Sequence, residues 1–155
     1  MKGFAINLFL VALFIFSMTS CGKNYYYQES HELKDGKWTS SDALTFHFEI
    51  SDTTQVYDFL LGIQHSLNYP CQNIYLQINA KFPSGHIDKQ IRTFDLANKA
   101  GTWFGDCDKN GCEFVFPIQK STFFKEVGHY TFEIKPYMRV DTLKVDKVSL
   151  FLEKK

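Results

Sequence analysis

Cys21 is the residue whose surroundings predict the most definite chemistry. It follows the small pair Thr19-Ser20 and an apolar run, Phe4–Phe16, which a single Lys2 precedes. A positive charge, a short apolar run and small residues before a cleavage site are typical of a secretory signal peptide, and the run is short for a membrane span. A cysteine directly after that site is an acceptor for lipid attachment. We therefore expect a signal helix in residues 1–20 that is cleaved off, and an acylated Cys21 that anchors the protein in a membrane. The alternative is an ordinary secreted protein in which Cys21 is a free thiol.

A second segment, Asp106–Gly111, has the acidic spacing and the glycine that open an EF-hand calcium loop. The glutamate that closes such a loop at its twelfth position is replaced by Pro117. The alternative is a tight β-hairpin, because Asn110-Gly111 can supply the positive φ angles that a two-residue turn requires. We expect the hairpin and no bound metal.

Three cysteines remain beyond Cys21, so at most one disulfide can form among them. A hairpin at Asn110-Gly111 places Cys107 and Cys112 opposite each other, and an oxidising compartment allows such a pair to form a disulfide. We expect that bond, with Cys71 left as a thiol.

The sequence carries no motif of a known catalytic or metal-binding class. Nucleophile-elbow, Walker-type and dinucleotide-binding patterns do not occur. The histidines lack the spacing of zinc ligands; they are His31, His47, His65, His86 and His129. A glycosidase needs two carboxylates that distant strands can bring together, so Glu49, Asp52, Asp95 and Glu133 are candidates, although acids on a solvated strand face are the simpler interpretation. We expect no enzyme activity and no cofactor.

Charge excludes another class of function. Loss of Lys2 with the signal peptide leaves 16 basic residues against 17 acidic ones. Nucleic-acid binding requires a basic surface, and no cluster of lysine or arginine is present. We expect no nucleic-acid partner, and membrane attachment through the acyl chains of Cys21 rather than through charge.

The elements that position these residues are predicted to be strands. Aromatic residues make up 17% of the chain, which favours β structure. In residues 44–50, apolar and polar side chains alternate, as in a half-buried strand. The same period recurs at residues 74–78, 87–94, 130–134 and 148–152, and turn residues separate these segments. The predicted fold is an all-β, antiparallel β-sandwich of the jelly-roll kind.

Predicted boundaries divide the chain into a signal peptide (1–20), an acylated cysteine with a tether (21–37), and a single β-sandwich domain (38–155). Val56–Leu67 favours an extended segment over a helix, and Phe94–Asn98 is expected to form one short helical turn. Tyr25–Tyr27 could lie in the membrane interface, stack on sugar rings or begin the first strand, and the strand is the preferred interpretation.

Taken in order, the residues of the mature chain resemble the GldH family of gliding-motility lipoproteins. Gln64, Val145-Asp146 and Ser149 depart from the family pattern, so the chain resembles a divergent member. The residues that carry the resemblance are Trp38, Thr45–Ile50, Asp52, Tyr57, Tyr69-Pro70, Asn73–Leu76, Leu96-Ala97, Gly101–Gly105, Phe123, Gly128–Tyr130, Phe132, Met138-Arg139 and Val148–Lys154.

The resemblance implies an outer-membrane lipoprotein that supports gliding motility and the linked protein-secretion machinery, with no catalytic residues to transfer. The partners it implies are other cell-envelope proteins of that apparatus. The alternative function is a carbohydrate-binding lipoprotein, because jelly-roll sandwiches often hold sugars against exposed aromatic side chains. Residues 22–25 lack acidic side chains that are typical of surface-export signals in such bacteria, so we expect the periplasmic face of the outer membrane.

Tyr137–Asp141 is the segment expected to form a partner-binding surface. Tyr137, Met138 and Arg139 combine an adaptable apolar area with a fixed donor fork, a composition enriched at the centres of protein interfaces. The alternative is a structural role in which Arg139 pairs with a carboxylate such as that of Asp141.

Overall fold

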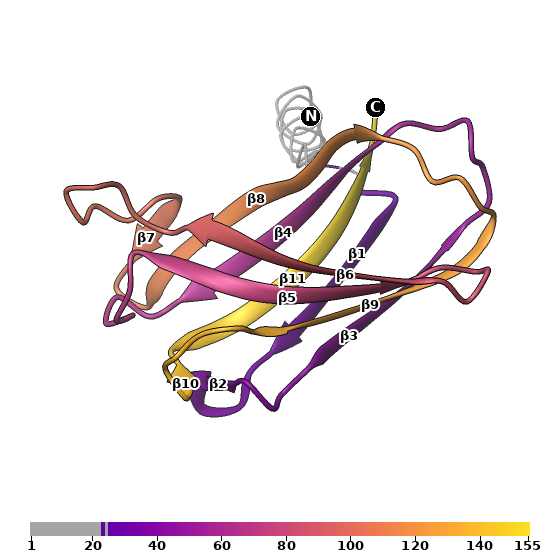
Figure 1. Ribbon diagram of the computed structural model, residues 1–155. Helices are drawn as coiled ribbons and strands as arrows, with labels where there is room; N and C mark the ends of the chain where they lie inside the picture. Colours follow the sequence, from indigo (N-terminus) through magenta and orange to yellow (C-terminus); the bar gives the residue numbers. More distant parts are fainter. Residues whose placement is uncertain (1–22, 24) are drawn as a thin grey trace, which may run out of the picture.

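Two antiparallel sheets face each other in the computed structural model, which describes residue 23 and residues 25–155 (Figure 1). The five-stranded sheet has the order β1-β11-β4-β8-β7, the four-stranded sheet has the order β3-β9-β5-β6, and β10 pairs with β2. The predicted all-β sandwich is therefore confirmed. The elements are β1 (Tyr27–Glu32), the 3₁₀ turn η1 (Lys34–Gly36), β2 (Trp38–Thr39), β3 (Leu44–Ile50), β4 (Tyr57–His65), β5 (Asn73–Lys81), β6 (Ile87–Asp95), β7 (Asp106–Asp108), β8 (Gly111–Thr122), β9 (Gly128–Pro136), β10 (Thr142–Leu143) and β11 (Val145–Lys154).

Alternation in β3 sets which residues enter the core. Phe46, Phe48 and Ile50 are buried, whereas His47 and Glu49 between them are exposed. Because successive side chains of a strand point to opposite faces, one face of β3 covers the core and the other meets solvent.

At the centre of the five-stranded sheet, β4 lies between β11 and β8. Every residue of β4 is buried except Gln64, so the strand is covered on both faces. The ring of Phe151 lies over Gly62, where an added Cβ would stand 3.1 Å from the Phe151 Cε2 atom. The preference for an extended segment at Val56–Leu67 is therefore confirmed.

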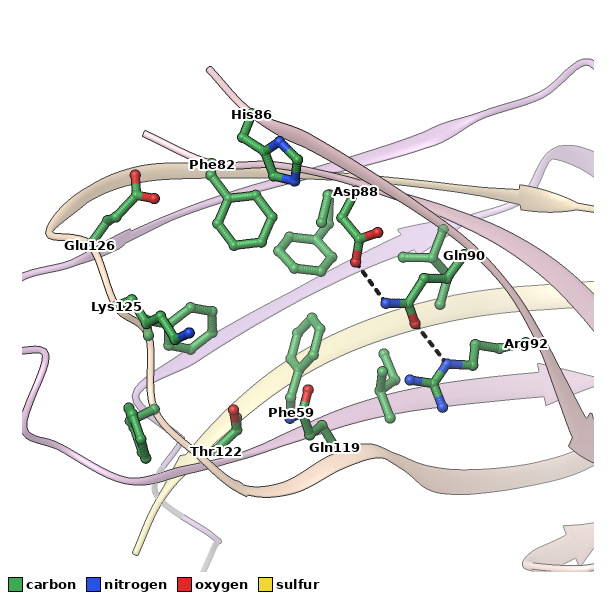
Figure 2. A pocket seen from close by; sticks show the side chains of 16 residues that line it. Phe59, Phe82, His86, Asp88, Gln90, Arg92, Gln119, Thr122, Lys125 and Glu126 are labelled. Carbon is green, nitrogen blue, oxygen red and sulfur yellow. Dashed lines mark hydrogen bonds between the residues drawn. The ribbon is translucent and has the colours of Figure 1, made fainter. Parts of the chain in front are cut away.

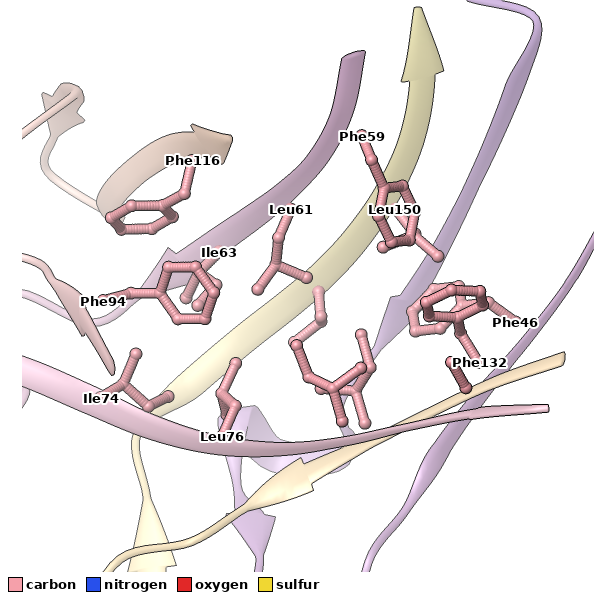
Figure 3. Packing of buried hydrophobic residues seen from close by; sticks show 14 of the residues in the cluster. Phe46, Phe59, Leu61, Ile63, Ile74, Leu76, Phe94, Phe116, Phe132 and Leu150 are labelled. Atoms are coloured by element: carbon pink, nitrogen blue, oxygen red, sulfur yellow. The ribbon is translucent and has the colours of Figure 1, made fainter. Parts of the chain in front are cut away.

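The core fills the space between the two sheets (Figure 3). Trp38 is fully buried near the β2–β10 ribbon, and its indole Nε1 donates a hydrogen bond to the Asp42 carbonyl oxygen at 2.7 Å. Contacts across the sheets include the Phe59–Phe132 ring pair at 4.8 Å and the Phe94–Phe116 pair at 5.1 Å.

The folded part of the chain begins earlier than the predicted boundary at residue 38. β1 lies inside the segment assigned to a tether, and it pairs with β11 over all six of its residues. Tyr27 is the first residue of this strand, in agreement with the preferred interpretation that the tyrosine run begins the first strand. Alternate side chains of β1 are partly buried, and the rings of Tyr27 and His31 pack against Phe48 and Phe46 at 5.2 and 4.7 Å, which explains why this polar segment is ordered. Cys21 and the signal peptide lie outside the described residues.

The helical turn predicted at Phe94–Asn98 is wrong. Phe94 and Asp95 end β6, and the main-chain N–H groups of Leu96 and Ala97 both donate to the Gln72 carbonyl oxygen, at 2.8 and 3.0 Å. These bonds to a distant segment replace the local bonds of a helical turn. Within the described residues, no helix has the length and apolar character to cross a membrane.

Candidate functional site

The segment predicted to bind a partner forms one wall of a groove on the protein surface. The groove has a volume of about 640 Å³ and is lined by Cys71, Tyr75, Tyr137, Met138, Arg139 and Val140. We call these six residues the Tyr137 groove. Tyr75 and Tyr137 are 40% and 56% exposed, so large aromatic surface faces solvent here.

Two hydrogen bonds to the main chain of Tyr75 hold the Tyr137 groove in shape. The Tyr137 N–H donates to the Tyr75 carbonyl oxygen at 2.8 Å, and the Tyr75 N–H donates to the Met138 sulfur at 3.3 Å. Because both main-chain groups of Tyr75 are engaged, the segment after β9 is fixed against β5. The side chains of the groove are therefore displayed on a rigid backbone.

Arg139 supplies a positive charge at this groove. Among the described residues, no carboxylate lies within 4.0 Å of its guanidinium, and Asp141 is not paired with it. The structural role considered above, an Arg139–Asp141 ion pair, therefore has no support in the structure. The guanidinium is left available to an external acceptor.

A second hollow opens between β6 and β8, at the open side of the sandwich (Figure 2). Its volume is about 490 Å³. The apolar floor is made by Phe59, Ile78, Ala80, Ile118 and Phe132, and the polar wall by Asp88, Gln90 and Arg92 of β6. We call this hollow the edge cleft.

The polar wall of the edge cleft occupies the core-facing side of β6. Phe94 is buried in the core, and Asp88, Gln90 and Arg92 precede it at intervals of two, so they point to the same side of the strand. The Gln90 Nε2 donates to the Asp88 Oδ2 at 2.6 Å, and the Arg92 Nε donates to the Gln90 Oε1 at 3.0 Å. The sequence did not predict this site. The polar residues that share one side of residues 87–95 with the apolar Phe94 could have indicated that this side is open to solvent.

The ends of the edge cleft are closed by different contacts. At one end the Phe94 and Phe116 rings bring the sheets together, at a centroid distance of 5.1 Å. At the other end the Ser84 N–H donates to the Glu126 carboxylate at 2.8 Å, which joins the loop after β5 to the loop after β8. The cleft is therefore a bounded space rather than a gap that continues through the molecule.

A buried carboxylate fixes the side of the edge cleft that β8 forms. The Asp58 Oδ1 accepts the Ser121 N–H at 2.8 Å, and its Oδ2 lies 2.8 Å from the Lys155 Nζ. The bond from Lys155, followed by that from Ser121, lowers the pKa of the Asp58 carboxyl below its usual value. Ser121 has a φ of 49°, and the pairing of β4 with β8 is irregular at this point. Such bulges bend a strand, and these lie in the part of β8 that borders the cleft.

The acidic segment at 106–111 is a hairpin whose turn differs from the predicted one. Asp108 pairs with Gly111, so Lys109 and Asn110 form the two-residue loop in place of Asn110-Gly111. The Asp108 Oδ1 accepts the N–H groups of Asn110 and Gly111, at 2.8 and 3.2 Å. The side chain of Asp108 therefore closes the turn. The Asn110-Gly111 pattern predicts only main-chain angles and takes no account of this side-chain contact.

The cysteines next to this turn are opposite each other. Cys107 pairs with Cys112 in the β7–β8 ladder, and a disulfide joins them, while Cys71 is a free cysteine of the Tyr137 groove. Across the described residues, no group of three or more histidine, cysteine or acidic side chains is arranged to hold a metal ion.

The candidate carboxylates are spread over the molecule. Glu49 stands opposite His129 and Glu133 opposite Thr45, four positions apart in the β3–β9 ladder, or about 13 Å at the rise of a strand. Asp52 accepts the Thr54 N–H at 2.8 Å in a turn, and Asp95 is exposed at the end of β6. A pair of glycosidase carboxylates stands closer together than Glu49 and Glu133.

Comparisons with known proteins support one family. Tripeptidyl peptidase 2, a solved structure, superposes with a TM-score of 0.42 at 8% identity, over 84% of this chain and only 10% of its own. The gliding motility lipoprotein GldH homolog of Christiangramia forsetii is 26% identical over 138 residues, which are 89% of this chain and 83% of that protein. Gliding motility lipoprotein GldH of Flavobacterium johnsoniae is 26% identical over 132 residues, 85% of this chain and 79% of that protein. A family model described as GldH lipoprotein matches residues 25–148. The chain therefore belongs to the GldH lipoprotein family, as the order of its residues predicts.

Proposed function

We propose that this protein is a non-enzymatic accessory component of the outer membrane, anchored through an acylated Cys21, that supports gliding motility and the linked protein-secretion machinery. The names of two relatives support the motility role, and the apolar run before Cys21 supports the anchor. In this proposal the β-sandwich acts by binding another cell-envelope protein, on the periplasmic face of the membrane.

The Tyr137 groove is the observation that carries the proposal. Large exposed aromatic and aliphatic side chains are costly to leave in water, and together with arginine they form the composition of interface centres. The Arg139 guanidinium adds a bidentate donor with no carboxylate beside it among the described residues. The expected partner therefore presents an apolar side chain to Tyr137 and a carboxylate to Arg139.

Carbohydrate binding has less support at this surface. Of the exposed aromatic side chains that a sugar could stack on, this groove holds Tyr75 and Tyr137. The rest of its apolar lining is Met138 and Val140, whose aliphatic side chains suit a protein surface better than a sugar.

Replacing Arg139 with alanine in cells tests the proposal. The expected result is loss of crosslinked partners together with reduced gliding or secretion, while protein abundance and melting temperature stay unchanged. Arg139→Lys keeps the charge but loses the bidentate fork, so partial recovery is expected. Lys81→Ala, which removes an exposed charge at the far end of β5, six positions from Tyr75 or about 20 Å along the strand, is the matched control and should leave all four measurements unchanged.

Two outcomes would overturn this function. If Arg139→Ala and Tyr137→Ser both recover as much crosslinked partner as the wild type does, the Tyr137 groove is not the binding surface. Specific glycan binding by the wild-type protein, retained in both variants, would favour the carbohydrate-binding alternative. Protease treatment of intact cells that removes the domain would place it on the outer surface of the membrane instead.

A further inference from the structure

We propose that an extended polypeptide segment of a partner binds beside β6, adds a fifth strand to the four-stranded sheet and fills the edge cleft. This site is separate from the Tyr137 groove, and the proposal does not depend on that groove. Four observations on β6 support it: its free edge, its exposed apolar side chains, the cleft below it and its uncompensated charges.

The free edge supplies main-chain hydrogen-bonding groups. β6 is the last strand of its sheet, and its nine residues pair with β5 on one side. On the other side, no main-chain group of β6 receives a hydrogen bond from the described part of the chain. β8, across the opening, pairs with β7 only up to Glu113, so its following residues are also open on that side. Free edges of this length are templates for an added strand.

The solvent face of β6 carries apolar side chains where polar ones are expected. Ile87 and Ile91 are 60% and 49% exposed and alternate with the polar Lys89 and Thr93, while the core-facing side of the same strand carries Asp88 and Gln90. This is the reverse of the usual pattern for a strand over a core. On an added strand, neighbouring side chains would stand about 5 Å from these isoleucines and cover them.

The edge cleft provides a place for the other face of the added strand. Its floor of Phe59, Ile118 and Phe132 is apolar, and its volume of about 490 Å³ holds a few large side chains. A strand beside β6 directs alternate side chains into this space, as the arrangement in Figure 2 allows.

Charge on the wall of the cleft specifies the occupant further. The Arg92 guanidinium has no carboxylate within 4.0 Å, and Asp88 has no cation within that distance, among the described residues. Asp88 and Arg92 are four positions apart, or about 13 Å along the strand. The complementary segment therefore carries an acidic residue opposite Arg92, a large apolar residue opposite Gln90 and a basic residue opposite Asp88. On its other face it carries apolar residues opposite Ile91 and Ile87.

A competing explanation is that the inward charges only protect a free edge from aggregation. Proteins do use inward-pointing charges in this way. That explanation accounts for Asp88 and Arg92, but it leaves the exposure of Ile87 and Ile91 unexplained, because apolar residues on an edge promote aggregation.

Selection from a displayed library of random nine-residue peptides on the full chain, purified in detergent, tests the proposal. The expected winners alternate apolar residues with one acidic and one basic residue, bind the wild type and Tyr137→Ser equally, and fail to bind Ile91→Lys. Hydrogen exchange of β6 amides should slow when a winning peptide is bound. Methylation of alternate peptide amides on the side that faces β6 should abolish binding, whereas methylation of the other amides should leave it intact.

Charge pairing gives a second measurement. Arg92→Ala should weaken binding of the acid-bearing peptide about two- to fivefold, the range of a partly exposed ion pair, and should not weaken binding of the same peptide with glutamine in place of the acid. Binders that depend on Tyr137 and ignore Ile91, or the absence of any binder that Ile91→Lys abolishes, would overturn the proposal while leaving the Tyr137 groove intact. Binding that tolerates both methylation patterns would also overturn it.

Discussion

Phe48 joins the two sheets, and its removal gives the sharpest test of the described core. It is 5% exposed and projects from β3 into a cluster of aromatic rings from both sheets. Its ring centroid lies within 6.2 Å of five others, those of Tyr27, Phe59, Phe124, Tyr130 and Phe132. No single neighbour can move to fill the space without losing its own ring contacts.

The cost of Phe48→Ala follows from this arrangement. Replacing a buried phenylalanine with alanine typically costs about 3–5 kcal/mol. Each lost aromatic pair adds about 0.5–1.5 kcal/mol beyond buried area, which places this site near the upper end, at about 4–5 kcal/mol. A single domain has about 5–15 kcal/mol of unfolding free energy in total. We therefore expect a fall in melting temperature of about 15 °C, or loss of the folded protein in cells.

Denaturant unfolding of the purified chain measures this free energy. Phe123→Ala is the matched control, because Phe123 is 59% exposed and its replacement should change stability by no more than about 0.5 kcal/mol. If Phe48→Ala cost under about 1 kcal/mol, or the same as Phe123→Ala, the ring cluster between the sheets would not exist as described.

Three further predictions concern the anchor, the disulfide and acid stability. Cys21→Ser should release the protein from membranes and abolish labelling by a clickable fatty acid; label that persists would refute the lipid anchor. Of the cysteines beyond Cys21, one should react with iodoacetamide without reduction, because Cys107 and Cys112 are bonded to each other. An intact mass with three modified cysteines would show that this disulfide does not form. Since the pKa of Asp58 is lowered in the folded state by Lys155, its contribution is fully present above about pH 4 and is lost as pH falls through the lowered value. Stability measured between pH 6 and pH 2 should therefore decline less steeply in Asp58→Asn than in the wild type, and identical slopes would contradict this role.

Local patterns in the sequence were sufficient for strands β3, β4, β5, β6, β9 and β11 and for the family, but not for β1, which was assigned to a tether. The alternation in residues 44–50 predicts which side of β3 is buried, because the side-chain period of a strand is a property of the strand itself. The order of aromatic and glycine residues predicts membership of the GldH family, because that order is read directly from the chain. A short hairpin between Cys107 and Cys112 brings the two cysteines near each other, whereas their pairing directly opposite each other depends on the turn at Lys109-Asn110.

Details of turns depend on side-chain contacts that a residue pattern does not contain. Asn110-Gly111 predicts a turn at the correct place, but the Asp108 carboxylate shifts it by one residue by accepting two main-chain N–H groups. Similarly, the predicted helical turn at Phe94–Asn98 is absent because the carbonyl of Gln72, more than twenty residues away, takes the N–H groups that the turn would use.

Alternation along the chain predicts most core strands and their buried faces, whereas only the folded arrangement shows which strands are edges and where the sandwich opens. β1 reads as a polar tether, yet it is part of the sheet because β11 lies beside it, and the Ser30 and Ser149 hydroxyls that meet across this pair are 119 residues apart in the chain. The sequence of β6 resembles an irregular strand. Its inward-pointing charges are explained by the edge cleft, which they line where the pairing of β8 with β4 becomes irregular. The physical reason is that alternation reports the two faces of one strand, while the environment of each face is set by strands that arrive from distant parts of the sequence.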